Sequence, residues 1–185
     1  LGHAAFFGAG AYAAGLFAKH VSGDPVAGLA VSAGVAALLG FSASFMVLRG
    51  SDLTRLMVTL GVSLVLHELA NHLDRITGGT DGLLGIAMTP IFGLFAFNFR
   101  GSTAYLYSLA VLFFAFLLAR RFVHSPFGLS LRAVKDNRLR ASSIGIAPAG
   151  RIVAVYTLAA VYAGLAGALL TDRKSTRLNS SHVSE

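Results

Sequence analysis

The chain has 185 residues, with 15 Lys and Arg against 8 Asp and Glu, which gives a formal net charge of +7. Hydrophobic residues make up 55% of the chain and charged residues 12%, and the mean hydropathy is +0.71. A water-soluble domain of this size needs far more charge to cover its surface, so the composition excludes one. The lack of cysteine excludes a disulfide framework and a thiolate metal site.

Long apolar segments follow one another along the chain. In order they are residues 4–18, 26–48, 56–69, 104–119 and 152–170. The second holds 23 residues without a charge, and about 20 helical residues suffice to cross a hydrocarbon core. These patterns predict an all-α fold, a polytopic transmembrane helix bundle.

The connections between these segments are polar, with one exception. Residues 19–25 and 49–55 form short polar connections, and residues 71–85 are rich in turn-forming residues. Residues 86–99 are apolar but contain Pro90 and Gly93, which favours a re-entrant or interfacial piece over a full span.

Basic residues are unequally shared between the two sides that alternating spans define. One side holds Arg49, Arg55, Arg120, Arg121, Arg132, Lys135, Arg138, Arg140 and Arg151. The other holds Lys19, Arg75 and Arg100. Lys and Arg accumulate in cytoplasmic loops, so the first side is predicted to be cytoplasmic. Because the cations lie between apolar spans and not along a soluble face, no nucleic-acid partner is expected.

The most basic loop, residues 123–151, separates two long spans. Taken alone, it reads as a solvated loop that rests on anionic lipid headgroups.

Four motifs together resemble a known family. They are LGHAAFFGAGAYAAGL at residues 1–16, ITGGTDGLLGI at 76–86, SPFGLSLRAVKDNRLRASSIGI at 125–146 and AGLAGALL at 163–170. In this order and spacing they resemble the permease subunit of branched-chain amino acid ABC importers, and the LivM-type member of the paired permeases more closely. The resemblance covers residues 1–170, and it implies that they are an internal fragment of a longer permease domain.

The resemblance implies a transport subunit of a bacterial or archaeal cytoplasmic membrane. It would move branched-chain amino acids inward by alternating access, beside a second permease subunit, two ATP-binding subunits and an extracytoplasmic substrate-binding protein. ATP and Mg would be bound by the partner subunits, and this chain would bind no cofactor. No Walker sequence occurs in it, so it is expected to hydrolyse nothing and not to be an enzyme.

The resemblance also implies an ATPase-coupling helix in the basic loop. Residues 131–143 are predicted to form this helix, and Gly145 after it allows a left-handed cap. The coupling residues are expected to be Leu131, Arg132, Val134, Arg138, Ala141, Ser142 and Gly145. The family often has a carboxylate and two alanines where this chain has Arg140, Ala141 and Ser142, so the match is degenerate here.

A glycine-rich loop is the second candidate site. It consists of Thr77, Gly78, Gly79, Thr80, Asp81 and Gly82. Glycine permits positive φ, and Thr and Asp side chains bond local backbone. It is either an external loop that contacts the binding protein or shapes the pore mouth, or a simple capped turn.

The sequence HELANH at residues 67–72 is a near miss for the zinc motif H-E-x-x-H. Five helical steps turn His72 about 140° away from His67, so the two cannot share a metal, and no metal site is expected. His67 and Glu68 remain candidates for the translocation path, since ionisable residues near a span are often functional.

Glycines in the apolar segments indicate close helix packing. Gly8, Gly10 and Gly15 lie in the first segment and Gly2 just before it, and Gly164 and Gly167 lie in the last.

Two alternative functions remain. A related permease for urea, short amides or aromatic acids would have the same architecture. A membrane-embedded enzyme or structural scaffold would need convergent ionisable residues within the spans, where only His67 and Glu68 are found.

The last segment changes composition abruptly. Residues 172–182 read DRKSTRLNSSH, which is the in-frame translation of a common sequencing-adapter oligonucleotide. We therefore expect residues 172–185 to be an assembly artefact, the alternative being a natural polar C-terminus. Resequencing the 3′ end of the gene should show the native frame leaving this sequence after Thr171. A genomic frame that encodes all eleven residues would refute the artefact.

Overall fold

The computed structural model describes residues 2–21, 23–48, 52–72 and 102–181. All elements in this part are α-helices, which confirms the predicted all-α class. They are α1 (Gly2–His20), α2 (Pro25–Leu48), α3 (Asp52–His72), α5 (Ser102–Val123), α6 (Pro126–Asp136), α7 (Arg138–Ser143) and α8 (Pro148–Ser181). The glycine-rich loop at 77–82 and the interrupted segment at 86–99 lie outside the described residues.

Three helices are long and apolar enough to cross a membrane. The qualifying stretches are Pro25–Met46 of α2, Tyr105–Val123 of α5 and Pro148–Thr171 of α8. They confirm the three strong spans expected from the sequence. In α3 the apolar stretch is shorter, Thr59–Leu69. The chain is thus an all-α transmembrane bundle.

Two boundaries differ from the prediction. The polar connection expected at residues 49–55 is shorter, because α3 already begins at Asp52. Helix α8 continues to Ser181, so the backbone of residues 172–181 is helical. A helical path does not test where those codons come from, and the adapter hypothesis stays a prediction.

The start of α2 follows from local chemistry. Asp24 precedes Pro25, and its Oδ1 accepts a hydrogen bond from the Val26 backbone N–H at 3.1 Å. Aspartate satisfies a free N–H of the first turn, while proline has no N–H to satisfy and a φ suited to the first helical position.

Small residues bring α2 and α8 into backbone contact. On α2, Ser32, Ala36 and Gly40 recur every fourth residue and all are buried. They face Ala160 and Gly164 of α8: a Cβ added at Gly40 would lie 2.4 Å from the Ala160 Cβ, and one at Gly164 would lie 2.4 Å from the Ala36 Cβ. Ser32 Oγ donates to the Gly164 carbonyl at 2.8 Å. This small-residue seam is typical of membrane helix packing.

Helix α1 joins the same seam. A Cβ at Gly10 would lie 2.5 Å from Gly164 Cα, and one at Gly167 would lie 2.0 Å from the Phe7 carbonyl oxygen. The packing role predicted for Gly10, Gly164 and Gly167 is therefore confirmed. It is wrong for Gly8, where an added Cβ meets nothing within 4 Å.

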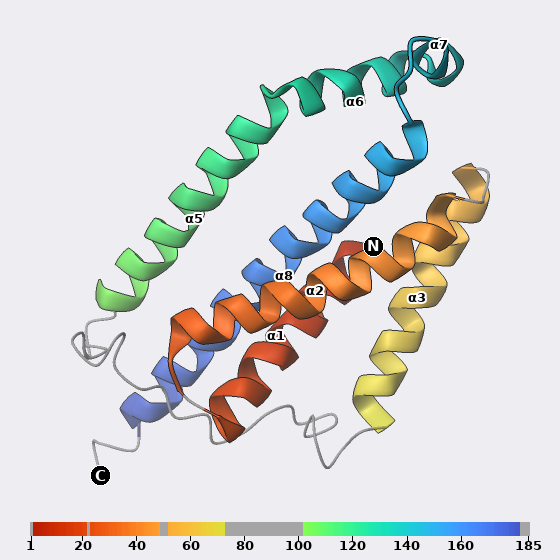
Figure 1. Ribbon diagram of the computed structural model, residues 1–185. Helices are drawn as coiled ribbons and strands as arrows, with labels where there is room; N and C mark the ends of the chain where they lie inside the picture. Colours follow the sequence, from red (N-terminus) through yellow and green to blue (C-terminus); the bar gives the residue numbers. More distant parts are fainter. Residues whose placement is uncertain (1, 22, 49–51, 73–101, 182–185) are drawn as a thin grey trace.

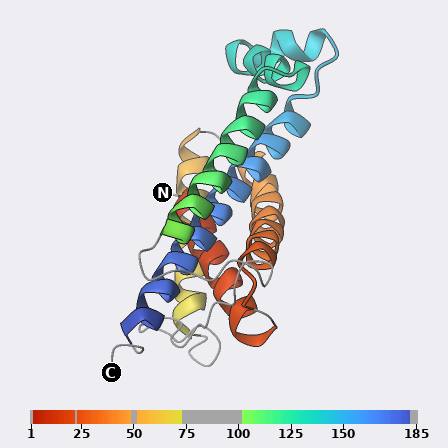
Figure 2. The ribbon, with the colours of Figure 1, turned by 90° about the vertical axis from the view of Figure 1, so that its left-hand side faces the viewer.

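Figures 1 and 2 show α1, α2 and α8 packed together, with α3 beside α1 and α2, and α5 along α8. Both views place α6 and α7 beyond the ends of α5 and α8, at the end where α2 finishes and α3 begins. The end of α1 and the start of α2 lie at the opposite end. The arrangement agrees with the alternation used to assign the cytoplasmic side.

The seam predicts that substitution by alanine changes the stability of the bundle differently at two glycines, Gly164 and Gly34. Gly164→Ala should destabilise the bundle by about 1–3 kcal/mol, because its methyl group would be forced into Ala36. Gly34→Ala, where an added Cβ meets nothing within 4 Å, is the matched control and should be neutral or stabilising by up to about 1 kcal/mol. Thermal unfolding in detergent measures the stability of both variants. Equal unfolding midpoints would contradict the close helix contact at Gly164.

Candidate functional site

The basic corner, residues 123–146, begins where α5 turns into α6. Ser125 is the N-cap of α6, and its Oγ accepts from the Gly128 N–H at 3.3 Å while it donates to the Phe122 carbonyl at 2.7 Å. Pro126 occupies the first turn. A Cβ at Gly128 would lie 2.1 Å from the Val123 carbonyl oxygen, so only glycine fits this close turn.

A three-residue clasp ties this corner to α5 and α8. The rings of Phe122 on α5 and Phe127 on α6 meet edge to face, with centroids 4.9 Å apart. The guanidinium carbon of Arg151, on α8, lies 4.6 Å from the centroid of the Phe127 ring. Cation–π and aromatic contacts of this kind hold three helix ends in one arrangement.

The single helix predicted over residues 131–143 is wrong. Asn137 has φ −155° and ψ 106°, which is extended backbone, and it separates α6 from α7. Its N–H closes α6 on the Ala133 carbonyl at 3.1 Å, and its Oδ1 caps α7 by accepting from the Arg140 N–H at 3.0 Å. Asparagine competes for local backbone groups in this way, so it favours a cap over a helix interior.

The left-handed cap predicted at Gly145 is confirmed. Its φ is +84°, and its N–H donates to the Ser142 carbonyl at 3.1 Å. The Ile146 N–H donates to the Ala141 carbonyl, also at 3.1 Å. These two bonds form a Schellman motif, which satisfies the last carbonyls of α7.

The predicted coupling residues take different positions in the corner. Arg132, Arg138, Ser142 and Gly145 are exposed, and Leu131 and Val134 are half-buried. Ala141 is buried at 2% exposure, so it packs against its own chain.

Three large apolar side chains of the corner are more than half exposed. Leu139 is 82% exposed, Ile144 70% and Leu129 61%. Sequence reasoning placed Leu139 on the helix but missed Ile144, which lies at the C-cap of α7. Exposed apolar side chains that form a contiguous patch mark a contact with another protein or with the membrane.

The HELANH residues lie at the opposite end of the bundle, on the last turns of α3. His67 and Glu68 are exposed, and His72 Nε2 lies 3.6 Å from Glu68 Oε1. Within the described ranges, His, Asp and Glu side chains form no group of three or more that could hold a metal ion. Whether His67 and Glu68 line a translocation path stays a prediction.

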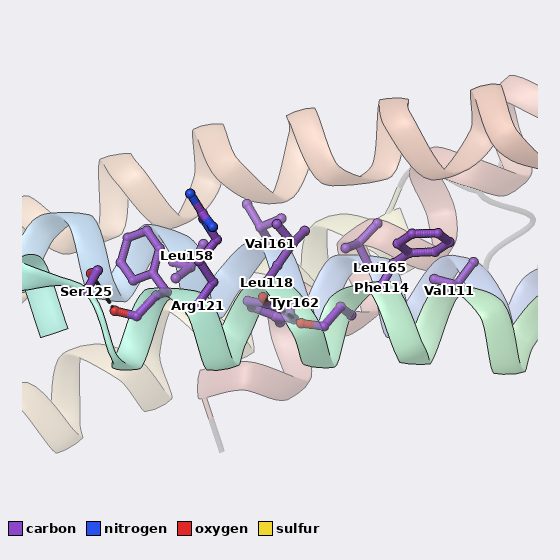
Figure 3. Close-up of a pocket in the computed structure, with 11 residues that line it drawn as sticks. Val111, Phe114, Leu118, Arg121, Ser125, Leu158, Val161, Tyr162 and Leu165 are labelled. Atoms are coloured by element: carbon purple, nitrogen blue, oxygen red, sulfur yellow. Dashed lines mark hydrogen bonds between the residues drawn. The ribbon is translucent and has the colours of Figure 1, made fainter.

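A groove runs between α5 and α8, with a volume of about 630 Å³. Figure 3 shows its labelled side chains in two rows, from Ser125 and Arg121 at one end to Val111 and Leu165 at the other. Tyr162 crosses the interface, and its hydroxyl donates to the Ala115 carbonyl at 3.0 Å. The lining is almost wholly apolar, so the groove is suited to hydrocarbon.

These features define a class: an α-helical membrane protein with a basic, capped corner at one end of its helices. The family model "Branched-chain amino acid transport system / permease component" matches residues 1–180. The chain belongs to this family.

Two relatives carry the same printed name, high-affinity branched-chain amino acid transport system permease protein LivM. The protein from Salmonella typhimurium (strain LT2) is 29% identical and that from Escherichia coli (strain K12) is 27% identical. Each comparison covers 94% of this chain and 46% of the relative, so the chain spans about half the length of these relatives. No solved structure matches the chain significantly.

The sidedness of the bundle can be tested with single cysteines, because the chain has none of its own. Lys135→Cys on α6 and Lys19→Cys on α1 replace exposed residues at opposite ends. A membrane-impermeant maleimide should label position 19 in intact cells and position 135 only in inverted vesicles. The reverse pattern would overturn the assignment of the basic corner to the cytoplasm.

Proposed function

We propose that this chain is part of the membrane subunit of an ATP-binding-cassette importer that moves branched-chain amino acids into the cell. Family membership supports the transport role and the substrate class. The permease would sit in the cytoplasmic membrane of a bacterium or archaeon and work with a second permease subunit and an extracytoplasmic binding protein. The ATP and Mg would belong to two ATP-binding subunits.

The observation that carries the coupling role is the capped end of α7, with Leu139 and Ile144 exposed at 82% and 70%. Exposed arginines in the same basic corner as these apolar side chains would suit a protein groove with an apolar floor and an acidic rim. Arg132, Arg138 and Arg140 are all exposed and would supply the charges of that rim contact.

The clasp gives this contact a mechanical route into the membrane. A displacement of α7 passes through α6 to Phe127, and from there to Phe122 on α5 and Arg151 on α8. Packed helices move as rigid bodies and not by bending at every turn. Closure of the ATP-binding subunits would therefore tilt α5 and α8 and drive alternating access.

The test uses Gly145, because its φ of +84° suits few side chains, while no atom lies within 4 Å of an added Cβ. A substitution there acts through the backbone alone. Gly145→Val should impose strain of about 1–2 kcal/mol, which corresponds to a roughly 5- to 30-fold loss of the capped form. Leucine uptake and transport-linked ATPase activity of the assembled importer should fall together.

Gly145→Asn is the matched control, since asparagine tolerates the left-handed conformation. A strain deleted for the full-length gene should lose uptake of labelled leucine and recover it with the wild type and the asparagine variant. Recovery of leucine uptake with the Gly145→Val variant would contradict the coupling role. Normal leucine uptake in the deletion strain would point to urea, short amides or aromatic acids, which competition with urea and benzoate would identify.

A further inference from the structure

Two grooves meet on the lipid-facing side of α8. The α5–α8 groove, of about 630 Å³, has a smaller neighbour of about 340 Å³ between α2 and α8, lined by Phe41 at one side and Val153 at the other. Both grooves are lined by Phe122, Leu158 and Val161. They are therefore two apolar channels that share one wall, close to the basic corner.

The length of the larger groove matches one leaflet of a bilayer. On α5 it reaches from Val111 to Phe122, eleven helical steps, which at 1.5 Å per step is about 16 Å. The hydrocarbon core is about 30 Å thick. The groove is therefore about as long as the acyl region of one phospholipid in the cytoplasmic leaflet.

Charge marks the cytoplasmic end of the groove. Arg121 lines it there, with Ser125 beside it, as Figure 3 shows. Between residues 102 and 171 the sequence holds seven Lys and Arg and one acidic residue, Asp136. In the described part of the chain, no carboxylate forms an ion pair with Arg121. Its charge is thus available to an anion at headgroup level.

We propose that the paired grooves bind one anionic phospholipid of the cytoplasmic leaflet. Its two acyl chains occupy the two channels on either side of Phe122, and its phosphate binds Arg121. An apolar channel open to the bilayer fills with hydrocarbon, and a cation near the surface selects a negatively charged headgroup. The site does not depend on the transport role, because it is built from the groove and its charge.

A single introduced tryptophan can report which molecule occupies the groove, because the 185 residues of this sequence contain no tryptophan. Phe114→Trp places it in the α5–α8 groove, and Phe113→Trp places it on the neighbouring position outside the groove lining. Both phenylalanines are exposed, at 65% and 58%. The full-length protein, with any other tryptophan changed to phenylalanine, is reconstituted in vesicles that contain phosphatidylglycerol or phosphatidylcholine with brominated acyl chains.

Brominated phosphatidylglycerol should quench the fluorescence of a tryptophan at position 114 more strongly than brominated phosphatidylcholine at the same mole fraction. The two lipids should quench a tryptophan at position 113 equally. Arg121→Gln should remove most of this preference, by about fivefold in relative affinity. Arg120→Gln is the matched control, since it deletes the same charge one residue away from the groove lining, and it should leave the preference in place.

Three results would overturn the proposal. The first is an equal preference at positions 113 and 114, and the second is a preference that survives Arg121→Gln. The third is the absence of quenching at 114 beside normal quenching at 113, because protein then covers the groove. The readout is fluorescence and not transport, so failure here leaves the proposed function standing.

Discussion

The structure depends on the close approach of α8 to α1 and α2. Lipid chains are as apolar as leucine, so no hydrophobic force drives these helices together, and association relies on van der Waals contact and interhelical hydrogen bonds. Glycine at 164 removes the side chain where three helices meet, and Ser32 adds a hydrogen bond of 2.8 Å to its carbonyl. Held in this way, α8 presents a fixed N-terminal end to the basic corner.

Because this end of α8 is fixed, the basic corner can pack closely and remain joined to both α5 and α8. Arg151 extends from the first turn of α8 to Phe127, while Gly128 lets α6 fold directly back against the end of α5. Phe122 belongs to the clasp and also to the wall that the two grooves share. The position of the corner and the shape of the grooves are therefore linked through one aromatic ring.

The sequence predicts well those features that depend on length and composition. The three spans follow from about 20 apolar residues in a row, and the cap at Gly145 follows because a positive φ strongly favours glycine. The break at Asn137 was missed, since the apolar positions on either side of it suit one continuous helix. The α2 side of the seam was also missed: Ser32, Ala36 and Gly40 are small, but their repeat does not say which helix they contact.

The same distinction applies to the candidate site: part of it follows from the sequence, and the rest depends on tertiary packing. Its residue types follow from the sequence, whereas the exposure of Leu139 and Ile144 and the contact of Arg151 with Phe127 are products of tertiary packing. The clasp joins positions 122, 127 and 151, which no local pattern connects.

The hydroxyl of Tyr162 has a consequence for the orientation of α5. Among the described helices α5 contacts α6 and α8, and the Tyr162 hydroxyl of α8 donates a hydrogen bond to the Ala115 carbonyl of α5 at 3.0 Å. The clasp fixes the Phe122 end of α5, and the bond to Ala115 adds a second fixed point further along the helix. The two together set the rotation of α5 about its own axis, and with it which of its aromatic side chains face α8 and which face the acyl chains of the bilayer.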